Sequence, residues 1–132
     1  MEEKIINDYR SIAIVGASGN PERPSYQVAD YLIEQGYQVS LVNPTVTEIM
    51  GQPSYPDLAS IPEPVEVVDI FRRSDQVEPI VEEAISIGAK AVWMQTGVVN
   101  EAAAEKARQA GLMVVMDKCI AGEHARITGQ TD

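Results

Sequence analysis

The sequence predicts a single α/β domain in which helices cover both faces of a doubly wound, mainly five-stranded parallel sheet. Five short aliphatic runs alternate with segments that carry helical signals, and they span residues 12–15, 39–42, 65–71, 91–94 and 112–116. Such runs are typical of parallel strands that are buried between two helical layers. A chain of 132 residues, 45% of them hydrophobic, can bury one core. We expect one domain over residues 1–132, with its core at about 10–127.

The segments between these runs carry the start and stop signals of helices. Pro24 predicts the first turn of one helix and Gly36 its end, because proline fits a helix start and glycine a helix end. Asn100 predicts the cap of an alanine-rich helix that ends at Gly111. Residues 119–127 predict one more short helix after the last strand.

Two connections are less regular. Five of the eight prolines fall within residues 44–64, so at most a short helix near 57–60 is expected there. After the third strand, Ser74 and Asp75 predict a helix cap. Pro79 predicts a break or a restart of the helix that follows.

Composition excludes several classes of function. The formal net charge of −10 opposes nucleic-acid binding, which needs an excess of Lys and Arg. No apolar run approaches the ~18 residues of a membrane span, and the N-terminal residues do not have the pattern of a signal peptide. The one cysteine, Cys119, cannot form an internal disulfide, as is typical of a reducing cytosol. We therefore expect a cytoplasmic protein that binds neither nucleic acid nor membranes.

The first strand and the loop after it predict a phosphate site. The strand runs into Gly16, Ala17 and Ser18, and a helix begins a few residues later. Free backbone N–H groups and the positive end of the helix dipole then lie together, which favours an anion.

The spacing of this loop disfavours NAD. In a G-x-G-x-x-G pattern counted from Gly16, Ser18 and Pro21 stand where the other two glycines are needed. The second strand ends in Asn43-Pro44, without the acid that binds the ribose of NAD. An NAD(P)-binding oxidoreductase or sensor is therefore the alternative rather than the leading interpretation.

Basic residues gather at the carboxyl ends of the predicted strands, where open parallel sheets bind ligands. They are Arg23, Arg72, Arg73 and Lys118. Such a cationic edge on an acidic protein can hold an anion by charge-assisted hydrogen bonds. A structural interpretation stays open beside it, in which the paired arginines neutralise Asp69 or Asp75 and Arg23 is a solvated turn residue.

Six segments together match a known family. They are Val15-Gly16-Ala17-Ser18, Pro21-Glu22-Arg23-Pro24-Ser25-Tyr26, Val42-Asn43-Pro44, Asp69-Ile70-Phe71-Arg72-Arg73-Ser74, Gln95-Thr96-Gly97-Val98 and Asp117-Lys118-Cys119. Over about residues 12–127 the chain resembles the small stand-alone CoA-binding proteins of bacteria and archaea. Their domain is similar to the CoA-binding domain of the succinyl-CoA synthetase α subunit. The resemblance implies a Rossmann-like domain with CoA or an acyl-CoA as its ligand.

The resemblance also implies where CoA would lie. Gly16, Ala17, Ser18, Arg23 and Ser25 would contact phosphate, Asn43 and Pro44 would border the adenosine, Phe71, Arg72 and Arg73 would line the groove, and Gln95 and Gly97 would flank the pantetheine. Lys118 adds a cation at the same edge. Cys119, beside it, is a candidate thiol partner for CoA if it is exposed, whereas a free cysteine is more often a small buried hydrophobe.

No catalytic centre is predicted. The related synthetases pass a phosphate through a histidine on a different domain, for which we expect no room here. The only histidine, His124, is expected at the surface or at a helix cap. No Cys and His cluster has metal-site spacing. We therefore expect a binding module without catalysis or metal. A protein-interaction domain with a vestigial groove remains an alternative, and a homo-oligomer or protein partner stays open.

Overall fold

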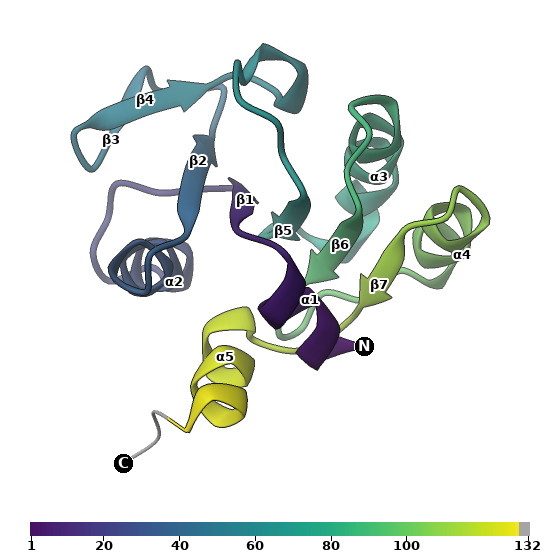
Figure 1. The fold of residues 1–132 in the computed structure, drawn as a ribbon. Helices are drawn as coiled ribbons and strands as arrows, with labels where there is room; N and C mark the ends of the chain where they lie inside the picture. The colour runs from purple at the N-terminus through teal and green to yellow at the C-terminus, as the bar shows by residue number, and fades with distance from the viewer. Residues whose placement is uncertain (130–132) are drawn as a thin grey trace.

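A seven-stranded sheet lies between two layers of helices in the computed structural model, which describes residues 1–129 (Figure 1). The strands are β1 (Ser11–Val15), β2 (Gln38–Val42), β3 (Glu48–Ile49), β4 (Gln52–Tyr55), β5 (Val67–Ile70), β6 (Ala91–Met94) and β7 (Met113–Val115). The helices are α1 (Glu2–Asp8), α2 (Pro24–Glu34), α3 (Val77–Ser86), α4 (Glu101–Gln109) and α5 (Ile120–Thr128), with the short 3₁₀ turns η1 (Leu58–Ser60) and η2 (Ser74–Gln76).

The strand order of the sheet is β3-β4-β2-β1-β5-β6-β7. The five predicted strands are confirmed as β1, β2, β5, β6 and β7. They pair in parallel in the order β2-β1-β5-β6-β7. From β1 the chain first adds strands on one side of the sheet, beginning with β2, and then returns to add β5 on the other side of β1. The loops after β1 and β5 therefore lead to opposite faces and leave a crevice at the carboxyl edge, where open parallel sheets bind ligands.

Two strands extend the sheet beyond the prediction. β4 pairs in parallel with the end of β2, and β3 folds back on β4 in the antiparallel direction. Both lie in the proline-rich stretch. Pro53 is tolerated there because β4 pairs with β2 only at Ser54 and Tyr55, so no ladder bond to β2 is needed at residue 53. The predicted short helix in the same stretch is confirmed as η1, where the Asp57 carboxylate accepts a hydrogen bond from the Ser60 N–H at 2.9 Å.

Alternating side chains of each strand divide the core into two layers. Ala13 and Val15 pack into the layer formed with α3 and α4, whereas Ile12 and Ile14 pack into the layer formed with α1, α2 and α5. Figure 1 shows the same division, with α3 and α4 side by side and α2 and α5 on the other side of the strands. Helices on both faces are thus confirmed, because successive strand residues point to opposite faces.

The helix signals are confirmed except after β5. Asn100 caps α4 by accepting a hydrogen bond from the Ala103 N–H at 2.9 Å. The predicted Ser74 and Asp75 cap is wrong, because these residues form η2 and Gln76 is the cap of α3. The predicted break at Pro79 is also wrong. Pro79 is the third residue of α3, where its missing N–H removes no bond within the helix.

The expected surface or capping position of His124 is wrong. His124 is 6% exposed, and its Nδ1 lies 2.8 Å from the Tyr31 hydroxyl oxygen. Its ring meets those of Tyr31 and Tyr37 edge to face. Desolvation, and to a smaller extent the nearby Arg10 guanidinium, lowers the pKa of His124. A neutral imidazole therefore fixes α5 against α2.

Acidification is expected to weaken this contact. Because the folded-state pKa of His124 lies below the unfolded value of about 6.5, its contribution to stability is present above pH ~6.5 and is lost as the pH falls through the folded pKa. We expect the free energy of unfolding, measured in urea, to fall more between pH 7.5 and pH 5.5 for the native protein than for His124→Phe. Equal losses in both proteins would contradict this role, since the chain has one histidine.

Candidate functional site

The loop after β1 approaches the end of β5 so closely that only glycine fits. Gly16 has φ +92°, and a Cβ there would lie 2.3 Å from the carbonyl oxygen of Phe71. The N–H groups of Gly16 and Ala17 both donate to the carbonyl of Val42, at 3.1 and 3.2 Å. The loop is therefore fixed against the ends of β2 and β5.

The first turn of α2 leaves the Ser25 N–H unbonded beside this loop, while the N–H groups of Tyr26 and Gln27 donate to the Arg23 carbonyl at 3.1 and 3.2 Å. Arg23 is the N-cap residue, Pro24 follows it, and no side chain accepts a hydrogen bond from this turn. The N–H groups of Ser18 and Ser25 have no acceptor among the described residues. Free donors and the positive end of the helix dipole thus meet at one point.

Asn43 braces the loop from the end of β2. Its Nδ2 donates to the Ala17 carbonyl at 2.9 Å, and its Oδ1 accepts from the Thr45 N–H at 2.9 Å and the Thr45 hydroxyl at 2.7 Å. Pro44, the next residue, is exposed. An amide occupies the place where NAD-binding sites carry an acid, and it is already engaged with the protein.

These elements enclose a cavity of about 380 Å³, called here the polar pocket. Its lining residues are Gly16, Ala17, Ser18, Arg23, Pro24, Ser25, Asn43, Phe71 and Arg72. Arg23 is exposed and Arg72 is half-buried, and neither forms an ion pair within residues 1–129. Both guanidinium groups are therefore free to meet an anion.

A second cavity, of about 570 Å³, adjoins the first and is called here the apolar pocket. It is lined by Pro24, Val28, Phe71, Arg72, Arg73, Gln95, Thr96, Val98 and Cys119. Pro24, Phe71 and Arg72 line both cavities, so the two form one groove at the carboxyl edge of the sheet. The Cys119 thiol is half-buried in its wall.

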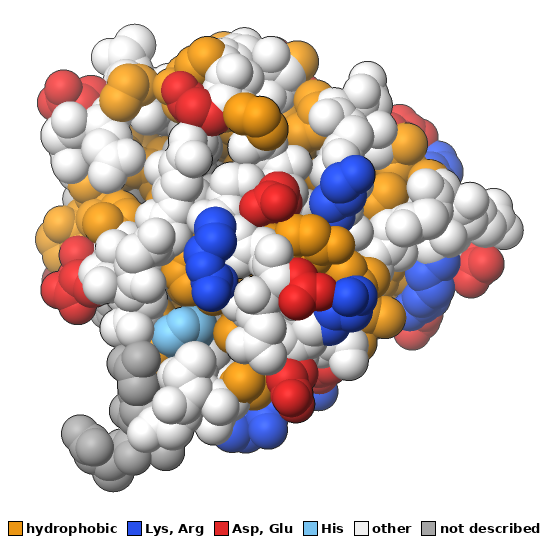
Figure 2. All heavy atoms as spheres, viewed as in Figure 1, with side chains coloured by type: hydrophobic (Ala, Val, Ile, Leu, Met, Phe, Trp, Pro, Cys, Tyr) orange, Lys and Arg blue, Asp and Glu red, His pale blue; other side chains and the backbone are white. Residues whose placement is uncertain are grey.

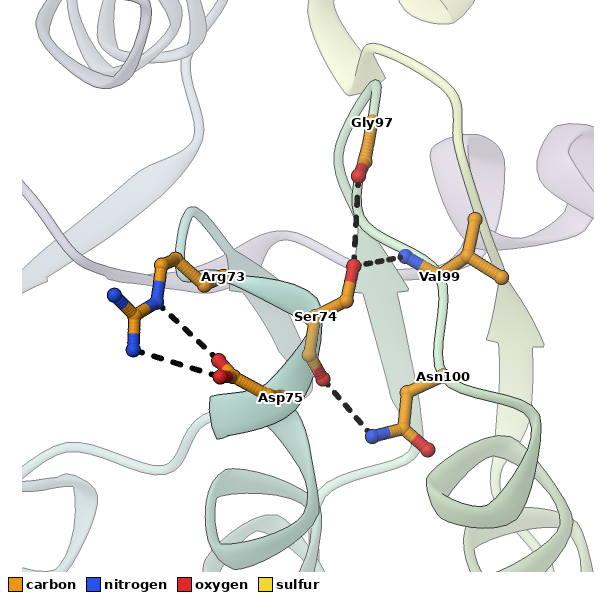
Figure 3. A network of polar contacts seen from close by, with 6 residues as sticks. All are labelled: Arg73, Ser74, Asp75, Gly97, Val99 and Asn100. Carbon is orange, nitrogen blue, oxygen red and sulfur yellow. Dashed lines mark hydrogen bonds and ion pairs between the residues drawn. The ribbon is translucent and has the colours of Figure 1, made fainter.

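Polar contacts join the loops on the far side of the groove (Figure 3). The Ser74 hydroxyl accepts from the Val99 N–H at 3.0 Å, and the Asn100 side chain donates to the Ser74 carbonyl at 2.9 Å. The Gly97 N–H donates to the Asp117 carboxylate at 2.6 Å. The loops after β5, β6 and β7 are thus held as one unit, and the Gly97 N–H is already bonded.

Three of the predicted site residues stand outside the two pockets: Pro44, Gly97 and Lys118. Lys118 forms an ion pair with Glu2 of α1, which raises the pKa of the lysine and lowers that of the glutamate. Arg73 lines the apolar pocket while its Nε lies 3.3 Å from an Asp75 carboxylate oxygen. Neutralisation of Asp75 by Arg73 is therefore present, as the structural interpretation expected.

Sequence reasoning missed part of the groove wall. Val28 is buried on α2 and lines the apolar pocket from there, but no role in the site was predicted for it. Thr96 and Val98 belong to a segment that carried the family resemblance, but no role was given to them. The available signal for Val28 was an apolar residue one turn into the helix that follows the β1 loop.

Asp69 lies buried on β5 near the groove. It is 0% exposed, and neither carboxylate oxygen has a hydrogen-bond partner. In the sheet it stands between Ile14 and Trp93, on the same face as Phe71 two residues later. Burial raises the pKa of this carboxyl well above its usual value. No arginine neutralises Asp69, contrary to one of the structural alternatives.

The surface seen in Figure 2 carries mixed charge. Lys and Arg side chains lie among Asp and Glu side chains on this face, with hydrophobic groups between them. In the part of the chain that the structure describes, no helix has both the length and the apolarity that crossing a bilayer requires. Residues 1–129 also contain no group of three or more potential metal ligands.

Comparisons with known proteins identify the family of this fold. A family model described as a CoA binding domain matches residues 10–125. The uncharacterized protein YneT of Bacillus subtilis (strain 168) is 37% identical over 123 residues, which are 93% of this chain and 91% of YneT. A hypothetical protein from Pyrococcus horikoshii OT3 has 43% identity and a TM-score of 0.94, with 97% of this chain and 90% of that chain covered.

A larger enzyme contains a similar domain. The dinucleotide-forming acetyl-coenzyme A synthetase 1 of Ca. Korarchaeum cryptofilum, solved with phosphate and ADP, is 29% identical with a TM-score of 0.72. The match covers 86% of this chain and 27% of the synthetase chain. From the family model, the relatives and the Rossmann-like sheet together, it follows that this chain belongs to the CoA-binding domain family.

Proposed function

We propose that the protein binds CoA or an acyl-CoA in the groove, with the phosphates in the polar pocket and the pantetheine arm directed into the apolar pocket. The observation that carries this proposal is the polar pocket itself. It combines the uncapped start of α2 with two unpaired guanidinium groups, Arg23 and Arg72, at the point where the strand order reverses.

Each part of the pocket has a defined task in this proposal. The free N–H groups at Ser18 and Ser25 donate to phosphate oxygens, and the α2 dipole adds favourable potential. Arg23 and Arg72 supply local positive charge in a chain whose net charge is −10. Asn43 on the pocket wall and Pro44 just outside it border the adenosine, and Gln95 of the apolar pocket faces the pantetheine.

We infer a binding module without catalysis of its own. Cys119 is the one candidate nucleophile that the sequence singled out, and the single imidazole of the chain is buried against Tyr31 rather than placed beside it. Without a base that contacts the nucleophile, the groove lacks the pair that nucleophilic catalysis needs.

Calorimetric titration with CoA, ADP and NAD tests the proposal. CoA should bind saturably, ADP more weakly, and NAD not at all. Arg72→Ala should weaken CoA binding about tenfold or more, because it removes a hydrogen bond to a charged group. Arg108→Ala is the matched control, since Arg108 lies on α4 and pairs with Glu105 outside the groove. Unchanged affinity in Arg72→Ala would remove Arg72 from the site, and tighter binding of NAD would overturn the proposal.

The Cys119 thiol provides a second measurement of how the ligand lies. If the pantetheine end reaches the apolar pocket, the Cys119 thiolate should attack CoA disulfide, forming one mixed disulfide and releasing one CoA thiol. Intact mass should then show one CoA adduct, which disappears in Cys119→Ser. A native protein that stays unmodified while it binds CoA would place the thiol end elsewhere.

A further inference from the structure

We infer that the apolar pocket is an acyl subsite, so that the preferred ligand is a CoA thioester with a short, apolar acyl group rather than free CoA. This inference rests on the proposed function and names the ligand class of the same groove. The sequence left open the choice between free CoA and an acyl derivative.

The walls of the pocket are the first argument. Pro24 and Val28 come from α2, Phe71 follows β5, and Val98 follows β6, so apolar groups converge from three elements. Val98 is 8% exposed and joins this wall to the core layer of α3 and α4, whereas its neighbour Val99 points outward and is 43% exposed. Apolar groups around a cavity favour an apolar occupant, because such an occupant releases water from both surfaces.

The polar groups of the pocket are the second argument. The Gln95 Oε1 accepts a hydrogen bond from the Ile120 N–H at 3.1 Å, and the Arg73 guanidinium is paired with Asp75. These contacts occupy the Gln95 carbonyl oxygen and Arg73, so the donors left for a polar ligand group are the Arg72 guanidinium, the Thr96 hydroxyl and the Gln95 amide NH₂. A polar group that is buried without a partner loses its hydrogen bonds to water, whereas a hydrocarbon chain has no such bonds to lose.

The position of the pocket is the third argument. It begins at Phe71 and Arg72, which it shares with the polar pocket, and its wall includes Cys119 at the start of α5. A ligand with its phosphates in the polar pocket therefore passes Phe71 with its arm and presents its sulfur end toward Cys119. The pocket has a volume of about 570 Å³, of which the arm must leave part to the acyl group.

Titration with CoA, acetyl-CoA, butyryl-CoA and hexanoyl-CoA tests the inference. Affinity should rise about fourfold for each added methylene that the pocket buries and then level off. Val98→Asp should bring the ratio of hexanoyl-CoA to CoA affinity close to 1. Val99→Asp, one residue away and exposed, is the matched control and should keep the native ratio.

The outcomes separate the two proposals. Equal affinity for CoA and for all three thioesters would overturn the acyl subsite and keep the proposed function, since the pocket would then hold the pantetheine arm alone. A chain-length dependence that survives in Val98→Asp would place the acyl group elsewhere and also overturn it. Absence of binding for all four ligands would overturn both.

Discussion

Gly16→Ala is expected to lower the melting temperature by about 10 °C or more, the largest loss of stability we predict for one added methyl group. The new Cβ would lie 2.3 Å from the backbone oxygen of Phe71, and the residue would keep φ +92°. Left-handed backbone costs roughly 1–2 kcal/mol for an L-residue, and overpacking against backbone costs about 1–3 kcal/mol more. For a domain of this size, about 3 kcal/mol corresponds to such a shift.

Gly36→Ala separates the two causes. Gly36 has φ +91°, but a Cβ there would meet no atom within 4 Å. In this variant we expect only the loss of stability that comes from the left-handed backbone, roughly 1–2 kcal/mol. Thermal unfolding of both proteins gives the comparison. Equal losses would mean that the approach of the β1 loop to β5 is looser than described and that the loop can move away.

The second large effect is expected at Asp69. Because burial raises its pKa in the folded state, the stability linked to its protonated form is fully present below the unfolded pKa of about 3.9. That stability is lost as the pH rises through the folded pKa, by at most about 1.4 kcal/mol per pH unit. Asp69→Asn should remove this decline and leave the variant more stable than the native protein at alkaline pH.

Urea unfolding from pH 5 to pH 9 measures the effect as a difference between the two proteins at each pH. The subtraction cancels His124, whose contribution has the opposite sign. Asp75→Asn is the control, because Asp75 is exposed and paired with Arg73. If the difference between native protein and Asp69→Asn does not change with pH, the Asp69 carboxyl is not held protonated by burial.

The sequence predicted the parts of this fold that rest on local signals. The aliphatic runs indicated the five parallel strands, and Asn100 and Pro24 indicated helix starts, because capping depends on a few neighbouring residues. β3 and β4 escaped prediction. They are short and β4 contains Pro53; β3 pairs only with β4, and β4 pairs with only the last two residues of β2, so the sequence carries no aliphatic run that would indicate them. α1 was also missed, since its docking depends on contacts with α5.

In the candidate site, too, the residues that are close together in the chain were predicted, and the contacts between distant residues were not. Gly16, Ser18 and Arg23 follow from a strand, loop and helix that are contiguous in the chain, and they line one pocket together. Lys118 shared the predicted edge, but its charge is taken by Glu2, 116 residues away. The burial of His124 was missed because its partners, Tyr31 and Tyr37, are far from it in the sequence; Tyr31 is 93 residues away.

The two sides of the groove are ordered by separate sets of bonds. Asn43 holds the β1 loop on one side, while Ser74, Asn100 and Asp117 join three loops on the other. In the free protein, substitutions such as Asn43→Ala and Asn100→Ala should therefore add in their effects on unfolding. A ligand that spans the groove contacts both sides at once. Its binding would couple the two sides, and the effects of the same two substitutions on unfolding would then no longer add. Cooperativity between the two sides of the groove would therefore be a property of the complex and not of the free protein.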